Sequence, residues 1–213
     1  MNWRLASRLS VITLAILVAV IVAVISTKAD QQSSNPNTQV DSSGLLGTSL
    51  GSSPAPDFHL VDQNGKQVSL SQFKGEPVIL TFLYTHCPDV CPLLASKLHQ
   101  VELNLGSSAQ HVAIVAVSVD PKGDTPTTVN AFSKAHGLLG YSNWHYLMGT
   151  EAQLSPVWSS YSVYSAPQAA QTNSVNHTTI IFIIDKQGHE RTYFDSSVTP
   201  AQMTTDMQIL LKQ

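Results

Sequence analysis

Three short, almost uninterrupted apolar runs constrain the fold of this 213-residue chain more than any other feature. They read VILTFL at residues 78–83, HVAIVAVSVD at 111–120 and HTTIIFIID at 177–185. Runs of this length and composition are typical of strands buried on both faces of a sheet. Because segments with helical spacing separate them, the runs indicate an α/β domain with helices packed on a sheet.

The helical spacing is clearest after the first run, where Leu94, Leu98, Val101 and Leu105 recur at intervals of three and four. Asn64-Gly65 predicts a hairpin before that run, and a second hairpin closes the sheet, so the sheet should be mixed. The remaining expected elements are helices at 127–136 and 152–161, a short strand at 144–149, a strand at 189–195 and a last helix with Pro200 in its first turn.

The N-terminal part of the chain has a different composition. Residues 1–8 carry Arg4 and Arg8, and residues 9–27 contain no charged side chain, which is close to the roughly 20 apolar residues that a membrane-spanning helix needs. We therefore expect a transmembrane anchor at 9–27, with a cleaved secretory signal as the alternative. The preceding arginines predict that the N-terminus is cytoplasmic and that the rest of the chain lies outside the cytoplasm.

Residues 28–55 are rich in Ser, Asn, Gln and Gly and contain few apolar residues, so we expect a flexible linker there. Residues 56–213 then form a single folded domain, because the chain is long enough for one ordinary core but not for two. A formal net charge of −3 provides no basic field, so nucleic acid is not an expected partner.

The two cysteines of the chain, Cys87 and Cys91, lie in the stretch FLYTHCPDVCP, directly after the first buried strand. The carboxyl ends of strands are where open α/β sheets usually carry their sites, which points to a thioredoxin-like domain. If Pro88 starts a helical turn, both sulfurs lie on one face next to the positive end of a helix, which favours thiolates. Such a pair can exchange disulfides or hold a soft metal, and a structural disulfide is the simpler alternative.

A third ligand would favour the metal, because thiolates together with an imidazole suit copper, and also zinc when a fourth group is supplied. His177 is the best candidate among eight histidines, since it begins the third apolar run and could face the cysteines across the sheet edge. His86 adjoins Cys87 and should project away from the sulfurs.

These residues resemble the Sco/SenC family of thioredoxin-like copper chaperones. The motifs that carry the resemblance are THCPDVCP at 85–92, SVDP at 118–121 with DTP at 124–126, and His177-Thr178 leading into Ile184-Asp185. The resemblance covers the chain from about residue 56 to the C-terminus. One departure is Asn176, where many relatives have an acidic residue.

The resemblance implies that Cys87, Cys91 and His177 are copper ligands, and that the cysteines also form a reversible disulfide. The implied function is delivery of copper, as Cu(I) or Cu(II), to the dinuclear copper centre of cytochrome c oxidase subunit II by a membrane-anchored, extracytoplasmic chaperone. The alternative is a thiol-disulfide oxidoreductase that keeps the copper-ligand cysteines of the oxidase reduced. Another copper chaperone or a thiol-disulfide reductant is a further implied partner.

Four other residues of these motifs have a structural and a functional interpretation. Asp89 favours a helix start or acts as a weak axial ligand. Asp120, Asp124 and Thr125 fit a structural role, with Asp124-Thr125-Pro126 capping the next helix. A peroxidase of the peroxiredoxin type is disfavoured, because no arginine occurs between Lys28 and Arg191 to bind a peroxide.

Overall fold

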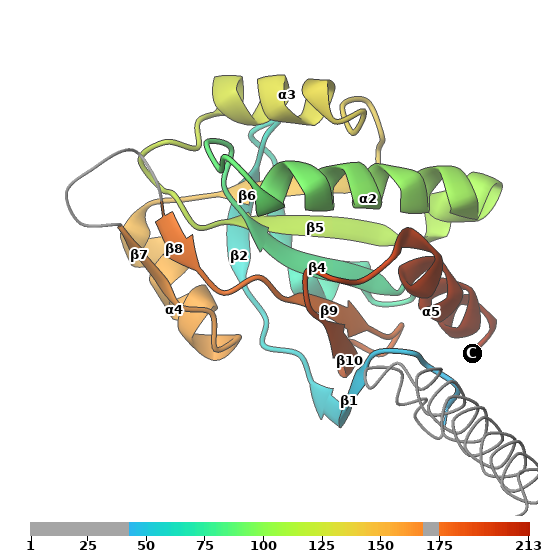
Figure 1. The fold of residues 1–213 in the computed structure, drawn as a ribbon. Coiled ribbons are helices and arrows are strands. Elements are labelled where there is room, and N and C mark those ends of the chain that lie inside the picture. The colour runs from blue at the N-terminus through green and yellow to red at the C-terminus, as the bar shows by residue number, and fades with distance from the viewer. Residues whose placement is uncertain (1–42, 168–174) are drawn as a thin grey trace, which may run out of the picture. The chain divides into compact units, whose positions relative to one another are not determined.

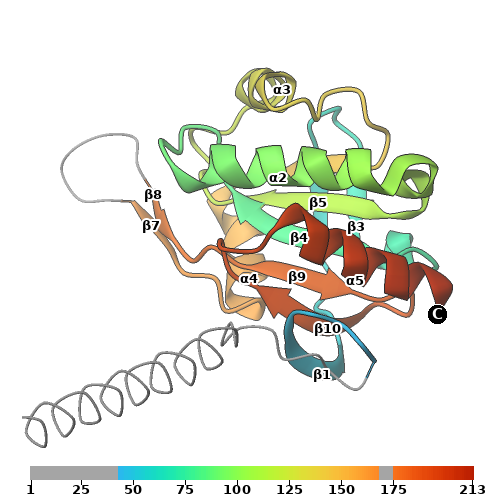
Figure 2. The same cartoon turned by 45° about the vertical axis from the view of Figure 1, so that its right-hand side comes forward.

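The computed structural model describes residues 43–167 and 175–213. These residues form an eight-stranded mixed sheet with helices on both faces, and a separate two-stranded sheet (Figures 1 and 2). The predicted anchor at residues 9–27 lies outside the described residues. Among the helices of the described ranges, none is both long enough and apolar enough to span a membrane.

Three parallel strands form the centre of the sheet. They are β4 (Val78–Leu83), β5 (Ala113–Ser118) and β6 (Trp144–Met148). Every residue of β4 and β5 is buried, as the first two apolar runs predicted. The two strands are in register from one end to the other, so their carboxyl ends meet at the same edge of the sheet.

Antiparallel strands flank this centre and make the sheet mixed, as expected. The full order is β1-β10-β9-β4-β5-β6-β2-β3. The predicted closing hairpin corresponds to β9 (Ile181–Ile184) and β10 (His189–Phe194). The predicted first hairpin corresponds to β2 (His59–Asp62) and β3 (Gln67–Ser69), and Gly65 has the positive φ of 77° that its turn requires.

The four predicted helices are all present. α2 (Val90–Leu105) and α5 (Pro200–Lys212) lie side by side over one face of the sheet, and α4 (Glu151–Ser160) lies over the other face (Figures 1 and 2). α3 (Pro126–Ala135) lies next to α2. Two short 3₁₀ helices, η1 (Leu70–Phe73) and η2 (Gly106–His111), complete the described elements.

The ordered fold begins earlier than the expected boundary at residue 56. Residues assigned to the linker form β1 (Thr48–Pro54), which pairs antiparallel with β10 at the edge of the sheet. Leu45 is fully buried before it, and the backbone N–H of Leu46 donates to Asp206 at 2.8 Å. An edge strand pairs through its backbone, so β1 needs no apolar alternation, and its Ser- and Gly-rich sequence resembles a linker.

The third apolar run is not one strand, which corrects the prediction for residues 177–185. His177 is the last residue of a separate strand, β8 (Val175–His177), which pairs with β7 (Ser165–Pro167), and β9 begins only at Ile181. Between the two strands the backbone N–H of Thr178 donates to the carbonyl of Tyr164 at 3.1 Å, outside the main sheet. The polar start of the run therefore belongs to a hairpin, and only its apolar part is buried in the sheet.

Candidate functional site

Cys87 and Cys91 lie where β4 leads into α2, at the carboxyl edge of the parallel strands. Cys87 is in the connecting loop, and Cys91 is the second residue of α2, which begins at Val90, two residues after Pro88. The reason for the later start is Asp89, whose φ of −139° and ψ of −87° are not helical. The exposed Asp89 thus occupies the position before the helix, without a side-chain cap.

The two sulfurs are free thiols that are nearly inaccessible to solvent. Cys87 is 8% exposed and Cys91 is 0% exposed. The backbone N–H of Cys91 donates to the Sγ atom of Cys87 at 3.4 Å. A donor directed at a sulfur stabilises the charged form of that sulfur, so this geometry selects Cys87 as the thiolate.

The two pKa values move in opposite directions. The pKa of Cys87 is lowered to about 5, chiefly because the Cys91 thiol donates to its sulfur, and this outweighs the opposing effect of burial. The pKa of Cys91 is raised, because its proton is held in that hydrogen bond and because it is buried. At neutral pH the pair therefore holds one proton, on Cys91, and one negative charge, on Cys87.

The backbone of His177 lies at the same edge of the sheet. β9 pairs antiparallel with β4, with Thr81 opposite Ile181, so the chain enters β9 from the carboxyl end of β4. The β7–β8 hairpin that precedes it is tied to the end of β5, because the Ser165 hydroxyl donates to the carbonyl of Val119 at 3.0 Å. The backbone position of His177, opposite Ser165, is thus on the side of the sheet where the cysteines lie.

Asp124, which the sequence predicts as part of a helix cap, is instead a buried carboxylate that connects the cysteine loop to the sheet. Asp124 accepts hydrogen bonds at Oδ1 from the backbone N–H and the hydroxyl of Thr85, both at 2.8 Å. At Oδ2 it accepts from the hydroxyls of Ser118 at 2.6 Å and Tyr146 at 2.9 Å. Burial nevertheless raises the pKa of Asp124, because none of these donors is a cation.

The capping role belongs to Thr125 alone, whose Oγ1 accepts the backbone N–H of Thr128 at 3.2 Å. Asp124 instead links Thr85, two residues before Cys87, to the end of β5 and the middle of β6. One sequence feature could have indicated this role of Asp124, namely the polar Ser118 at the end of a strand that is otherwise apolar. Its hydrogen bond to Asp124 explains why a polar residue is buried there.

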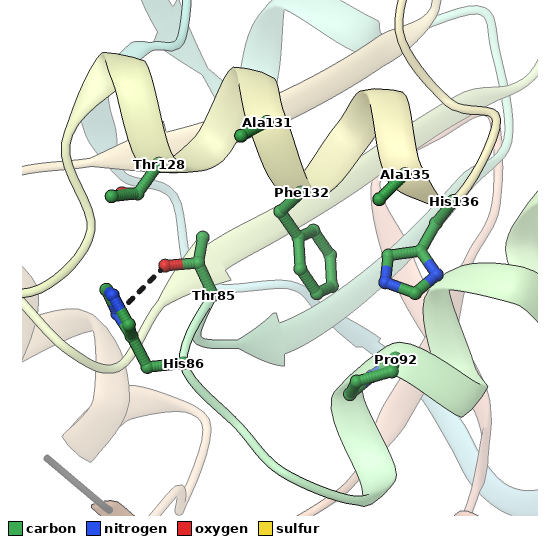
Figure 3. A pocket seen from close by; sticks show the side chains of 8 residues that line it. All are labelled: Thr85, His86, Pro92, Thr128, Ala131, Phe132, Ala135 and His136. Atoms are coloured by element: carbon green, nitrogen blue, oxygen red, sulfur yellow. Dashed lines mark hydrogen bonds between the residues drawn. The ribbon is translucent and has the colours of Figure 1, made fainter.

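His86 is exposed and adjoins Cys87 in the cysteine loop. Its Nδ1 lies 3.2 Å from the hydroxyl of Thr85 (Figure 3). Both residues line a groove between the cysteine loop and α3, which Pro92, Phe132 and His136 also flank (Figure 3). The cysteine loop thus carries an exposed imidazole next to the buried thiol pair.

A thiol pair directly after the central strand of a mixed, helix-covered sheet defines a thioredoxin-like protein with a redox- or metal-competent site. Comparison of the whole sequence with models of known families then identifies the family. The profile of the SCO1/SenC family matches residues 48–212. The chain belongs to the SCO1/SenC family.

Known proteins agree with this assignment. The copper-bound ScoI of Bradyrhizobium japonicum has a TM-score of 0.66 and 32% identity, over 75% of this chain and 100% of that chain. The SCO1 protein homolog of Bacillus subtilis is 25% identical over 162 residues, which are 71% of this chain and 82% of the relative.

A third protein shares the fold at lower identity. BsSco is described as a member of the Sco family of cytochrome c oxidase assembly proteins in which a disulfide switch was identified. It has a TM-score of 0.65 and 23% identity, over 78% of this chain and 98% of that chain. At this identity the likeness shows the fold alone.

Proposed function

We propose that this protein binds copper through Cys87, Cys91 and His177 and delivers it for the assembly of cytochrome c oxidase. The observation that carries the proposal is the free thiol pair, which holds a ready thiolate on Cys87 at the carboxyl edge of the sheet. The copper-bound ScoI, at 32% identity over its whole length, supports the choice of copper.

The donor set fits copper as a cargo. Thiolate sulfur is a soft ligand that selects Cu(I), and an imidazole nitrogen is compatible with both copper oxidation states. Binding requires only that Cys91 lose its proton, since Cys87 is already ionised at neutral pH. The negative charge of the Cys87 thiolate attracts the ion, and the proton of Cys91 leaves when the Cys91 sulfur coordinates the metal.

Delivery follows by ligand exchange, in which thiolates of the acceptor replace the ligands of this protein one at a time. The acceptor we propose is the dinuclear copper centre of cytochrome c oxidase subunit II, and the donor we propose is another copper chaperone. We also propose that residues 9–27 anchor the chain in the membrane, with residues 56–213 on the extracytoplasmic side, because the arginines at positions 4 and 8 precede the apolar segment.

The second candidate function is a thiol-disulfide reductase for the same acceptor. The observation that favours it is that the pKa of Cys87 is lowered while the pKa of Cys91 is raised. The Cys87 thiolate would attack a disulfide of the acceptor and form a mixed disulfide, which releases one acceptor thiolate. Cys91 would then attack the Cys87 sulfur, giving its proton to the second acceptor thiolate as this leaves. The acceptor gains two electrons, and this protein becomes the Cys87–Cys91 disulfide.

Copper titration of the purified, reduced full-length chain separates the two functions. We would follow thiolate-to-copper absorption in competition with a chelator, for the wild type and for His177→Ala and Cys91→Ser. His111→Ala is a matched control, because His111 is exposed and lies just before the amino end of β5, at the opposite edge of the sheet.

The chaperone proposal predicts one tightly bound copper per chain, which both site variants weaken and His111→Ala leaves unchanged. If the wild type binds copper no better than Cys91→Ser but cycles readily between dithiol and disulfide, the copper proposal fails and the reductase takes its place. In that case His177→Ala retains full reductase activity, because disulfide exchange requires the two sulfurs alone.

A further inference from the structure

A second group of metal-ligating side chains lies beside the thiol pair and shares none of its residues. His86 belongs to the cysteine loop, and Asp120 and Asp124 belong to the connection between β5 and α3. Each of the three offers one ligand atom, and these atoms all lie within 4.8 Å of one another. His86 is exposed and Asp120 is half-buried, so the group is open to solvent from one side.

The backbone of Gly123 allows this convergence. A Cβ atom at residue 123 would lie 2.9 Å from Cγ of Asp120 and 3.0 Å from Nδ1 of His86, so any side chain there would push these two residues apart. Asp120 is also oriented by the backbone, because its Oδ1 accepts from the N–H of Gly123 at 2.9 Å. The lack of a side chain at Gly123 therefore leaves room for the carboxylate of Asp120 and the imidazole of His86 beside it.

The two carboxylates lack a cationic partner. In residues 43–167 and 175–213, the ion pairs of the protein are formed by Asp62 and Asp185, and neither Asp120 nor Asp124 joins one. The charge of Asp124 is in addition buried, with only 6% of the residue exposed. Two carboxylates held this close repel each other, and a divalent cation between them would relieve that repulsion.

Asp124 can contribute a ligand without losing its place in the fold. Its Oδ2 is occupied by Ser118 and Tyr146, and its Oδ1 by the backbone N–H and the hydroxyl of Thr85. One of these donors, the Thr85 hydroxyl, lies 3.2 Å from Nδ1 of His86 (Figure 3). An ion could replace that one hydrogen bond, while the other three keep Asp124 in position.

We propose that His86, Asp120 and Asp124 form a second cation site, for a divalent first-row transition ion of which Zn²⁺ is the probe. One imidazole nitrogen and two carboxylate oxygens suit Zn²⁺ and leave a fourth tetrahedral position for water. The same donors suit Cu(I) poorly, because they contain no soft sulfur. The two sites therefore differ in the ions they select, although they share one loop.

The test uses the full-length chain with Cys87→Ser and Cys91→Ser, which removes the thiols and with them any soft-metal site. Calorimetric titration with Zn²⁺ should give one bound ion per chain. Adding His86→Ala or Asp120→Asn to this background should weaken binding by about tenfold or more, since each removes a ligand. His136→Ala is the matched control, because His136 lines the same groove but does not belong to the cluster.

Two further variants make the outcome decisive. Gly123→Ala should weaken Zn²⁺ binding although it removes no ligand, and His177→Ala should leave it unchanged. Absence of a stoichiometric site, or a site that His177→Ala removes and His86→Ala spares, would overturn the proposal. Because the background carries no thiols, this result is independent of the proposed copper function, which is judged in the chain with both cysteines.

Discussion

Replacement of Cys91 by alanine should raise the pKa of Cys87. The thiol of Cys91 is the principal donor to the Cys87 sulfur and the largest cause of its low pKa. Alanine removes that donor but keeps the backbone N–H of residue 91, which donates to the same sulfur at 3.4 Å. We therefore expect the pKa to rise from about 5 toward the ordinary cysteine value without reaching it.

The size of the effect at neutral pH is large. With a pKa of about 5, Cys87 is ionised at pH 7 in a ratio of about 100 to 1. An unperturbed cysteine, with a pKa of about 8.5, is instead protonated at pH 7 in a ratio of roughly 30 to 1. The variant lies between these limits, so its thiolate fraction at pH 7 and its alkylation rate should both fall.

The assay is the ultraviolet absorbance of the thiolate as a function of pH, with the reduced full-length chain. Both Cys91→Ala and Cys91→Ser leave Cys87 as the single thiol, so the titration belongs to it alone. Serine keeps an O–H donor and should raise the pKa less than alanine does. An unchanged titration curve in Cys91→Ala would refute the assignment of the low pKa to the Cys91 thiol.

The same shift has a consequence for stability. Because folding lowers the pKa of Cys87, ionisation of this thiol stabilises the folded state. This stabilisation is fully present above the unfolded pKa and is lost as the pH falls through the native pKa. In urea unfolding, the free energy of unfolding of the reduced wild type should therefore rise between about pH 5 and pH 9 more steeply than that of Cys91→Ala. Parallel pH profiles would contradict this linkage.

Three further predictions concern the framework, and urea unfolding measures each of them. Tyr146→Phe keeps the buried ring but removes the 2.9 Å hydrogen bond to Asp124, so it should lower the free energy of unfolding by about 1–2 kcal/mol; no loss would mean that this bond contributes nothing. Thr125→Ala removes the cap of α3 and should cost about 1 kcal/mol, whereas Thr125→Ser should cost less. Leu98→Ala opens a cavity in the fully buried face of α2 and should cost about 2–5 kcal/mol, and a cost below 1 kcal/mol would show that the core closes around it.

The central elements of the fold were predictable because burial on both faces leaves a strong sequence pattern. β4 and β5 are apolar at almost every position, and α2 shows its helical period in Leu94, Leu98, Val101 and Leu105. The edge of the sheet was not predictable in this way. β1 contributes backbone pairing to β10 and needs no apolar side chains, so its sequence resembles that of a linker.

The position of the thiol pair after a central strand was predictable from the sequence, but its electrostatics were not. The motif around Cys87 and Cys91 indicated a reactive or metal-binding pair, yet which sulfur holds the proton depends on the hydrogen bond that the Cys91 thiol donates to Cys87 in the folded chain. Asp124 was interpreted as part of a helix cap, because its burial depends on Tyr146 and Ser118, which approach it only in the folded chain. The sequence shows that His177 follows a polar stretch. It does not show that His177 belongs to the β7–β8 hairpin, which brings its backbone to the sheet edge.

The most direct test of the central claim is X-ray absorption at the copper edge of the copper-loaded full-length chain. The proposal predicts that the ion is bound by two sulfur ligands and one imidazole nitrogen, and that His177→Ala removes the imidazole contribution but keeps the sulfurs. A copper site without sulfur, or an imidazole signal that His177→Ala leaves unchanged, would contradict the assignment of Cys87, Cys91 and His177 as the copper ligands.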